Sequence, residues 1–408
     1  MNGTSARTED RTAEDRHMLP LFFEFHNPTK VVYGPGLVAD LQAELTQIGA
    51  RRYLLVSDRC LEALGLPSRV ATSLEEAGVE VVGTFLDVPE NSEVGAVRAC
   101  ADAALAAGAD GLVALGGGSV IDTAKCADIL ITEGGDLVDD HSGAGTLTRP
   151  LKPLVAIPTT AGTGSEVTRA AVVLDEANAV KLSFSDTFLL PTLAVLDPEL
   201  TVSLPPGLTA GTAMDALTHA VESYVSPQWS PVSESLAAGA VRLIFANLES
   251  AVADGSDLEA RGALLIAAAM AGMAFSHAMV GCVHGMAHAV GGLYHVPHGA
   301  ANAILLPHGL AYNRREIEER LGGLAPFVGG LTPGEDALSP ADRVVAAIAG
   351  LTERLNAAGV LATRLRDVGV PEEGLEAVAE AAVIDGTSFY NPREVVAEEI
   401  LSHLRDAY

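Results

Sequence analysis

The stretch Gly111-Leu-Val-Ala-Leu-Gly-Gly-Gly-Ser119 is a short apolar run followed at once by three glycines and a serine. The apolar run predicts a strand over Gly111–Leu115, and the segment Val120–Ile131 after it predicts a helix. Glycines at such a turn let backbone N–H groups approach a phosphate, and the helix N-terminus adds a favourable dipole. The stretch has neither the GxGxxG spacing nor a GK[ST] sequence, so it carries neither common nucleotide-binding fingerprint. By itself it therefore predicts an α/β domain rather than a particular ligand.

Strand and helix patterns alternate on both sides of this stretch. Amphipathic segments that predict helices separate short runs of β-forming residues, and this alternation indicates βαβ units with a parallel sheet. The further strands predicted are Tyr53–Ser57, Val79–Val82 and Leu154–Ile157, and the helices between them are Leu61–Ala77 and Val94–Ala107.

Polar residues follow two of these strands. Asp58 comes directly after one strand, and Thr159-Thr-Ala-Gly-Thr-Gly-Ser165 follows another. Ligands of α/β sheets bind at the carboxyl ends of parallel strands, so both segments are candidate nucleotide contacts. A carboxylate at Asp58 would accept hydrogen bonds from ribose hydroxyls and repel a 2′-phosphate. A helix N-cap is the alternative role for Asp58.

The pattern changes near Leu193-Ala-Val-Leu-Asp-Pro198, after which helical spacing dominates. A chain of 408 residues also exceeds one ordinary core, so two domains are expected. We place an α/β domain at residues 19–203 and an all-helical domain at 204–408. Residues 1–18 are polar and charged without the apolar core of a signal peptide, and are expected to form a disordered tail. Gly322–Pro340 is rich in glycine and proline and predicts a surface loop.

Composition excludes several classes of partner. The net charge of −28 provides no basic surface for a nucleic acid. The four cysteines have no CxxC spacing, which fits a reducing cytoplasm rather than a disulfide framework or zinc ribbon. The most apolar run, Ala263–Phe275, is shorter than the ~20 residues of a membrane helix and predicts a buried helix instead. We therefore expect a cytoplasmic protein without a membrane partner.

Three segments of the second half combine an aspartate with histidines: Asp215-Ala-Leu-Thr-His219, His284-Gly-Met-Ala-His288 and Pro297-His298. A helix presents residues four apart on one face, so Asp215 and His219 can share an ion. His284 and His298 are about 21 Å apart in an unbroken helix, so a break at Gly291-Gly292 and Pro297 must return the chain. One carboxylate with three imidazoles suits Fe²⁺, Zn²⁺ or Co²⁺. The expected ligands are Asp215, His219, His284 and His298.

Two less specific interpretations accompany this metal site. The histidines would be core residues and caps if no ion were bound. Cys282, two residues before His284, is either a further ligand or a small buried thiol, and the buried thiol is favoured.

Four segments together strongly resemble the iron-containing (group III) alcohol dehydrogenases. They are Gly116–Lys125, Ile157–Thr168, Asp215–Glu222, and Gly285–His288 continuing through Pro297–Asn302. The resemblance extends from about Phe25 to Asn391-Pro392. It implies a dehydroquinate synthase-like fold, with a Rossmann-like α/β N-terminal domain and an all-α C-terminal domain. It also implies that NAD(P) and a metal meet in the cleft between the domains.

The resemblance implies the same four metal ligands, with Fe²⁺ as the metal and Zn²⁺ as the alternative. It implies NAD(H), with NADP(H) as the alternative. His288 resembles the family's proton-relay residue, and Lys181 resembles a residue near the nicotinamide ribose. The loops and the resemblance together give the expected cofactor-binding residues Asp58, Asn91, Gly116, Gly117, Gly118, Ser119, Asp122, Thr159, Thr160, Thr163 and Lys181.

Two positions depart from the family pattern: His277 replaces a common Asn, and Ala289 replaces a common Pro. We expect the substrate pocket where Phe275, His277 and Arg169 approach the metal. His277 and Arg169 can donate hydrogen bonds to an anion. In the alternative, Arg169 points to solvent or pairs with a neighbouring carboxylate, Asp175 or Glu166.

The sequence thus predicts a metal- and NAD-dependent alcohol dehydrogenase that mainly reduces a small polar aldehyde to the primary alcohol. In one alternative, the enzyme reduces an anionic aldehyde such as phosphonoacetaldehyde or succinic semialdehyde. Others are a maleylacetate reductase or glycerol dehydrogenase and, more remotely, a dehydroquinate synthase-like lyase or a nucleotide sensor without activity. A homodimer is expected.

Overall fold

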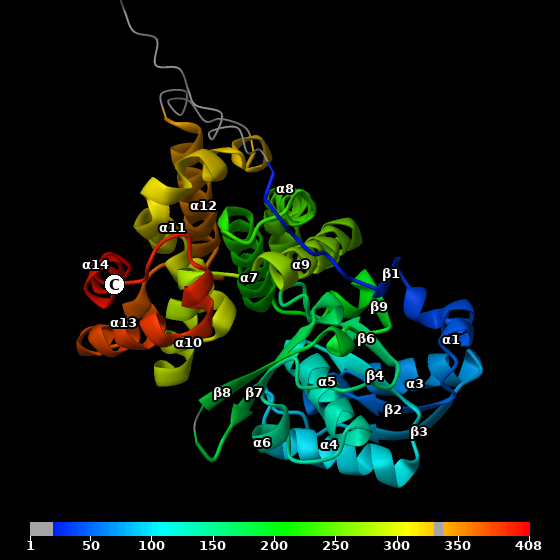
Figure 1. Ribbon diagram of the computed structural model, residues 1–408. Coiled ribbons are helices and arrows are strands. Elements are labelled where there is room, and N and C mark those ends of the chain that lie inside the picture. The colour runs from blue at the N-terminus through cyan, green and yellow to red at the C-terminus, as the bar shows by residue number, and fades with distance from the viewer. Residues whose placement is uncertain (1–18, 179, 330–337) are drawn as a thin grey trace, which may run out of the picture.

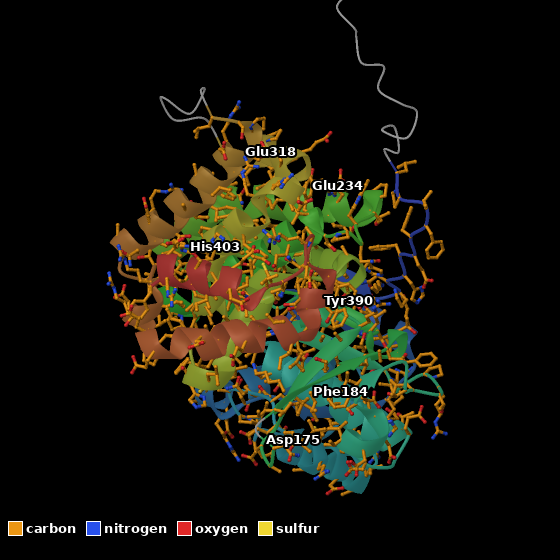
Figure 2. All side chains as sticks on the ribbon, turned by 60° about the vertical axis from the view of Figure 1, so that its left-hand side comes forward. Asp175, Phe184, Glu234, Glu318, Tyr390 and His403 are labelled. Atoms are coloured by element: carbon orange, nitrogen blue, oxygen red, sulfur yellow. The ribbon has the colours of Figure 1, made fainter. Side chains whose placement is uncertain are left out.

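The computed structural model describes residues 19–178, 180–329 and 338–408, which form an α/β layer and a helical layer (Figure 1). The predicted tail at residues 1–18 lies outside the described residues. Residues 330–337 of the predicted loop Gly322–Pro340 also lie outside them. Figure 2 shows the layers from another side, with His403 and Tyr390 in the helical layer and Phe184 and Asp175 in the α/β layer.

The N-terminal domain is built on a six-stranded sheet in which every pairing is parallel. Its order is β1 (Lys30–Tyr33), β9 (Leu193–Leu196), β6 (Leu154–Pro158), β4 (Gly111–Gly116), β2 (Arg52–Val56) and β3 (Glu80–Phe85). All six residues of β4 are buried, because a parallel sheet has helices on both faces and its strands are continuously apolar.

Helices cover both faces of this sheet, which confirms the predicted α/β domain with a parallel sheet. One apolar core joins alternate sheet residues to α4 (Val94–Ala107) and α5 (Gly118–Thr132). The other core joins the intervening residues to α1 (Gln42–Ile48) and α3 (Leu66–Glu76). The short helices α2 (Arg59–Ala63) and α6 (Leu137–His141) complete the domain.

Two sequence predictions were wrong in detail here. The single helix predicted over Leu61–Ala77 is divided into α2 and α3, because Gly65 between them adopts a left-handed φ of 73° and Pro67 lies in the first turn of α3. A second sheet was also missed. It pairs β5 (Gly143–Ala144) with β8 (Val180–Ser185), and β8 with β7 (Ala170–Asp175).

The C-terminal domain is helical, as predicted. Its helices are α7 (Pro206–Val225), α8 (Pro231–Ala253), α9 (Leu258–Ala278), α10 (Cys282–Tyr294), α11 (His298–Gly322), α12 (Pro340–Ala357), α13 (Leu375–Ile384) and α14 (Ala397–Asp406). Short 3₁₀ turns across both domains are Leu37–Ala39, Ser165–Val167, Thr187–Leu189, Pro198–Thr201, Ala325–Phe327, Leu365–Val368, Glu372–Gly374 and Gly386–Tyr390. Strand β9 ends before residue 203, and α7, the first helix of the C-terminal domain, begins after it. The domain boundary at residue 203 stays a prediction.

Two helices, α8 and α9, are long and apolar enough to cross a membrane by length and composition alone. The length argument made for Ala263–Phe275 was therefore wrong, because the helix that contains this run has 21 residues. Most of α9 is nevertheless buried against α7 and α8 in the core of the helical domain, which confirms the predicted buried helix (Figure 1).

Candidate metal and cofactor site

The four predicted metal ligands come from three helices of the C-terminal domain. Asp215 and His219 lie one turn apart on α7, His284 lies on α10, and His298 is the first residue of α11. The reversal between α10 and α11 occurs at His295, which adopts a left-handed φ of 56°, and at Pro297. Gly291 and Gly292 remain inside α10, so the prediction that they break the helix was wrong.

The donor atoms converge around the Asp215 carboxylate. Asp215 Oδ1 lies 3.4 Å from His298 Nε2, 3.8 Å from His284 Nε2 and 4.0 Å from His219 Nε2. Metal–ligand bonds of about 2.0–2.2 Å in a tetrahedron give ligand–ligand distances of about 3.3–3.6 Å. Small side-chain movements would therefore close the set around one ion. Asp215, His284 and His298 form the tightest group, with His219 slightly farther out.

The chemistry of the donor set also fits a metal. Burial lowers the pKa of His219 and of His284 to about 4 and the pKa of His298 well below its usual value. The imidazoles are therefore neutral near pH 7, which is the form that binds metals. His219 and His284 are buried, whereas the side chain of His298 is 35% exposed. The accessible side of the site is thus the side of His298.

Two further buried residues contact the ligands, and the sequence had given neither a role. Asn302 Nδ2 lies 2.6 Å from Asp215 Oδ1 and 3.1 Å from His298 Nε2. Glu222 Oε2 lies 2.5 Å from His284 Nδ1, on the face of the imidazole away from Asp215. Burial raises the pKa of Glu222 to about 7, opposed by hydrogen bonds from backbone N–H groups. Asn302 follows His298 by four residues, and Glu222 follows His219 by three, so helical spacing was the available signal.

Cys282 does not belong to the donor set. Its side chain is fully buried, and Asn313 Nδ2 lies 3.4 Å from its Sγ. Burial raises the pKa of the thiol, which disfavours the thiolate that a metal would require. The favoured prediction of a small buried thiol is confirmed.

His288, the predicted proton-relay residue, lies beside the donor set. Its ring stacks on that of His298, with centroids 5.3 Å apart. Its Nδ1 lies 3.0 Å from Asp385 Oδ2, while Asp385 Oδ1 accepts hydrogen bonds from the N–H and the hydroxyl of Thr387. Because the carboxylate accepts, His288 Nδ1 carries the proton and Nε2 keeps its lone pair. Asp385 lies 97 residues from His288 and was missed by the sequence analysis.

The predicted glycine turn lies where β4 meets α5. A Cβ on Gly116 would lie 2.5 Å from Val120 Cγ2, and one on Gly118 would lie 2.7 Å from Thr163 Cγ2. Gly117 is the N-cap residue of α5 and has no side chain to cover the free N–H groups of the first turn. The turn therefore presents backbone donors, which fits the predicted phosphate contact.

The order of the strands explains why the carboxyl ends of β2 and β4 are suited to bind a dinucleotide. From β2 the chain crosses to β3 on one side and then to β4 on the other, so the topological switch point lies between β2 and β4. Open α/β sheets bind ligands outside the carboxyl ends of the strands at such a point. Asp58 follows β2 and Gly117 follows β4, so both predicted segments lie at the switch point.

The remaining predicted cofactor residues occupy the same edge or its surroundings. Ser119 Oγ donates to the backbone oxygen of Glu90, next to the exposed Asn91. Asp122 accepts hydrogen bonds from Ser165 Oγ and Val172 N, so it braces α5 against the neighbouring segments. The other four are Thr159, Thr160 and Thr163, in the loop after β6, and Lys181, on β8. None of these contacts tests a cofactor role, which stays a prediction.

Comparisons with known proteins agree with this geometry. The profile described as "Iron-containing alcohol dehydrogenase" matches residues 28–198, and that described as "Fe-containing alcohol dehydrogenase family, C-terminal" matches residues 209–408. The chain belongs to the iron-containing alcohol dehydrogenase family. It is therefore an alcohol dehydrogenase, an oxidoreductase, with the dehydroquinate synthase-like fold that the sequence predicted. The expected NAD(H) and Fe²⁺ agree with membership of this family.

Several relatives cover nearly the whole chain of this alcohol dehydrogenase. It is 41% identical to a 1,3-propanediol dehydrogenase of Citrobacter freundii over 95% of this chain and 99% of the relative. It is 38% identical to an NAD-dependent methanol dehydrogenase of Bacillus methanolicus over 94% of this chain and 99% of the relative. A crystal structure of a 1,3-propanediol oxidoreductase superposes with a TM-score of 0.90 at 40% identity, covering 95% of this chain and all of that one.

The three predicted substrate residues of the dehydrogenase have different surroundings in the structure. Phe275 stacks on the ligand His219, with ring centroids 4.3 Å apart, so it lies beside the metal site as expected. His277 instead stacks on Phe25, its Nδ1 contacts Met273 O, and its Nε2 accepts from the backbone N–H of His26. Both ring nitrogens thus contact the protein, and a substrate role for His277 stays a prediction. No ion pair joins Arg169 to Asp175 or Glu166 among the described residues.

Asp58 has the N-cap role that was the alternative reading of the sequence, since its Oδ1 accepts from Leu61 N at 2.8 Å. The neighbouring Arg59 is held by Asp87 and Glu62, so it is not free to neutralise a 2′-phosphate. We expect Asp58→Gly to raise the ratio of kcat/KM for NADPH to that for NADH, because a like charge is removed. Asp58→Asn removes the charge but keeps an acceptor for Leu61 N, so it should raise the same ratio if the charge rather than the cap selects the cofactor. A wild-type enzyme that already prefers NADPH contradicts the selector role.

Proposed function

We propose that the enzyme uses NAD(H) and Fe²⁺ to interconvert a small polar aldehyde and its primary alcohol, and that it works mainly as the reductase. The observation that carries the proposal is the convergence of one carboxylate and three neutral imidazoles on α7, α10 and α11, with His288 directly beside them. The relatives named for 1,3-propanediol and methanol support a small primary alcohol as the reduced member of the substrate pair.

Several residues of the chain have separate roles in the proposed reaction. A divalent ion held by Asp215, His219, His284 and His298 would polarise the substrate oxygen, and the nicotinamide would supply or accept the hydride. The free backbone N–H groups in the first turn of α5, after Gly117, would hold the cofactor phosphates. Phe275 covers one side of His219 and limits the access of water. His288 transfers a proton at Nε2 while Asp385 holds its Nδ1.

A neutral polar substrate is favoured over an anionic one. The anionic alternative relied on His277 and Arg169 together, and His277 is engaged by Phe25 and His26. Arg169 is half-buried and its side chain makes no ion pair or hydrogen bond among the described residues. A sulfoacetaldehyde reductase crystallised with NAD⁺ is a structural relative at 26% identity and a TM-score of 0.84. Arg169 therefore still supports the alternative. A lyase reaction has no support from the named relatives.

The substrate class is tested by following NADH oxidation with a matched set of aldehydes. We expect 3-hydroxypropanal and propanal to give higher kcat/KM values than succinic semialdehyde and phosphonoacetaldehyde. An unpaired carboxylate or phosphonate would lose its hydration without gaining a partner. Arg169→Gln should change the neutral substrates little. A preference for an anionic aldehyde that disappears in Arg169→Gln would establish the alternative instead.

We also propose that the enzyme is a cytoplasmic homodimer, as the sequence analysis expected. Leu21 and Phe22 are 95% and 81% exposed, and a second copy would remove this apolar surface from water. Light scattering of the purified protein tests the oligomeric state.

A further inference from the structure

Glu222 lies on the same face of α7 as two of the metal ligands. It follows Asp215 by seven residues and His219 by three, so the three side chains form one stripe along the helix. Glu222 is only 4% exposed. A buried carboxylate is costly unless hydrogen bonds compensate it, so its partners indicate its purpose.

The partners of Glu222 all lie at the start of α10. Its Oε1 accepts from Val283 N at 2.8 Å, and its Oε2 lies 3.3 Å from His284 N and 2.5 Å from His284 Nδ1. The N-cap residue of α10 is Gly281, which has no side chain to bind these N–H groups. A Cβ on Gly281 would lie 3.1 Å from Glu222 Oε1, so the glycine makes room for the carboxylate.

A second residue from a distant part of the chain caps the same helix end. Asn391 Oδ1 accepts from Cys282 N at 3.1 Å and from Asn313 Nδ2 at 2.8 Å. Asn391 and Glu222 thus share the capping of α10. Only Glu222 also contacts the imidazole of a metal ligand, which makes Asn391 a matched comparison for it.

The contact with His284 fixes the state of that ring. The ionised carboxylate can only accept, and both of its oxygens already accept from backbone N–H groups, so His284 Nδ1 carries the proton and Nε2 keeps its lone pair. The Nε2 atom is the one that lies 3.8 Å from Asp215 Oδ1, on the side of the donor set. Carboxylates in this position orient metal-binding histidines and make them stronger ligands.

We propose that Glu222 is a positioning residue of the metal site, which holds His284 in the tautomer and orientation that bind the ion and thereby sets the metal affinity. The proposal rests on the proposed function for the presence of a divalent ion at Asp215, His219, His284 and His298. It gives Glu222 a role beyond capping α10.

The test is the Zn²⁺ affinity of metal-free protein, measured by competition with a chromophoric chelator. In Glu222→Gln the amide offers one acceptor and one donor, so it cannot accept from both Val283 N and His284 Nδ1. If the amide donates to Nδ1, the proton moves to Nε2 and blocks the ligand atom. We expect Zn²⁺ to bind about 10- to 100-fold more weakly than in wild type. The visible spectrum of bound Co²⁺ should change as well.

Asn391→Ala provides the control, because it removes a cap from the same helix end without touching His284. We expect this variant to lower the Tm of the metal-free protein while its Zn²⁺ affinity stays at the wild-type value. If Glu222→Gln does not fold, Glu222→Asp keeps the charge but shortens the reach, and it should still weaken Zn²⁺ binding.

Two outcomes separate this role from the proposed function. A Glu222 variant with wild-type Zn²⁺ affinity and a lowered Tm would show that Glu222 only caps α10, and would overturn the role while leaving the metal site intact. A wild-type protein that binds neither Zn²⁺ nor Co²⁺ stoichiometrically would overturn the metal-dependent function itself, and with it the positioning role.

Discussion

His219→Ala is expected to remove the bound metal and to lower kcat/KM by roughly 10³-fold or more, because Lewis-acid stabilisation supplies several kcal/mol and each factor of ten is about 1.4 kcal/mol. His219 is one of only four donors, and its Nε2 lies 4.0 Å from Asp215 Oδ1. Removing His219 leaves three protein donors, Asp215, His284 and His298, which would hold an ion less tightly. Metal analysis of the purified variant should therefore show less than stoichiometric Fe²⁺.

Cofactor binding should survive this change. The glycine turn at Gly117 belongs to the other domain, so NADH fluorescence titration of His219→Ala should give a Kd close to that of wild type. His403→Ala is the control variant, since it removes an imidazole from α14 that packs on Tyr312 rather than on the donor set. Full activity of His219→Ala in the presence of a chelator contradicts a metal-dependent reaction.

The local part of this site was predictable from the sequence because the relevant contacts follow helical spacing. Asp215 and His219 lie one turn apart on α7, and the turn around Gly117 lies at the end of a strand, as its sequence indicated. Both features depend on residues close together in the chain. The family resemblance then connected the two halves that periodicity could not join.

The supporting residues escaped prediction because their contacts depend on tertiary packing. Asp385 reaches His288 across 97 residues, and Glu222 reaches His284 across 62. No periodicity connects such pairs. The same limit applies to His277, where the sequence could not show that the extended N-terminal segment passes over the end of α9 and that the backbone N–H of His26 donates to Nε2.

The break between α10 and α11 illustrates a different limit. The two glycines in α10 were expected to take part in the break together with Pro297, since glycine weakens helices by about 1 kcal/mol relative to alanine. The helix nevertheless continues through them, and the chain turns at His295, whose φ is 56°. Tertiary packing on both sides of α10 outweighs the local cost of the glycines, and Pro297 then sets the start of α11.

His288→Ala is expected to lower kcat by about 10²- to 10⁴-fold, the usual contribution of a positioned general acid or base. His288 stacks on His298 and shares its Nδ1 proton with Asp385, so its Nε2 is the atom left for proton transfer. Because His288 is not among the four predicted ligands, Fe²⁺ content and the Kd for NADH should stay close to wild type. Proton transfer should become slower than hydride transfer, so the solvent isotope effect on kcat should increase.

The matched control for this variant is His295→Asn, which removes an exposed imidazole from the end of the same helix. Asparagine tolerates the left-handed φ of 56° at this position, so the α10–α11 turn should persist. We expect His295→Asn to retain wild-type kcat. Loss of Fe²⁺ from His288→Ala would instead make His288 part of the metal site. An unchanged kcat with metal retained would mean that solvent exchanges the proton with the substrate directly, without a relay through His288.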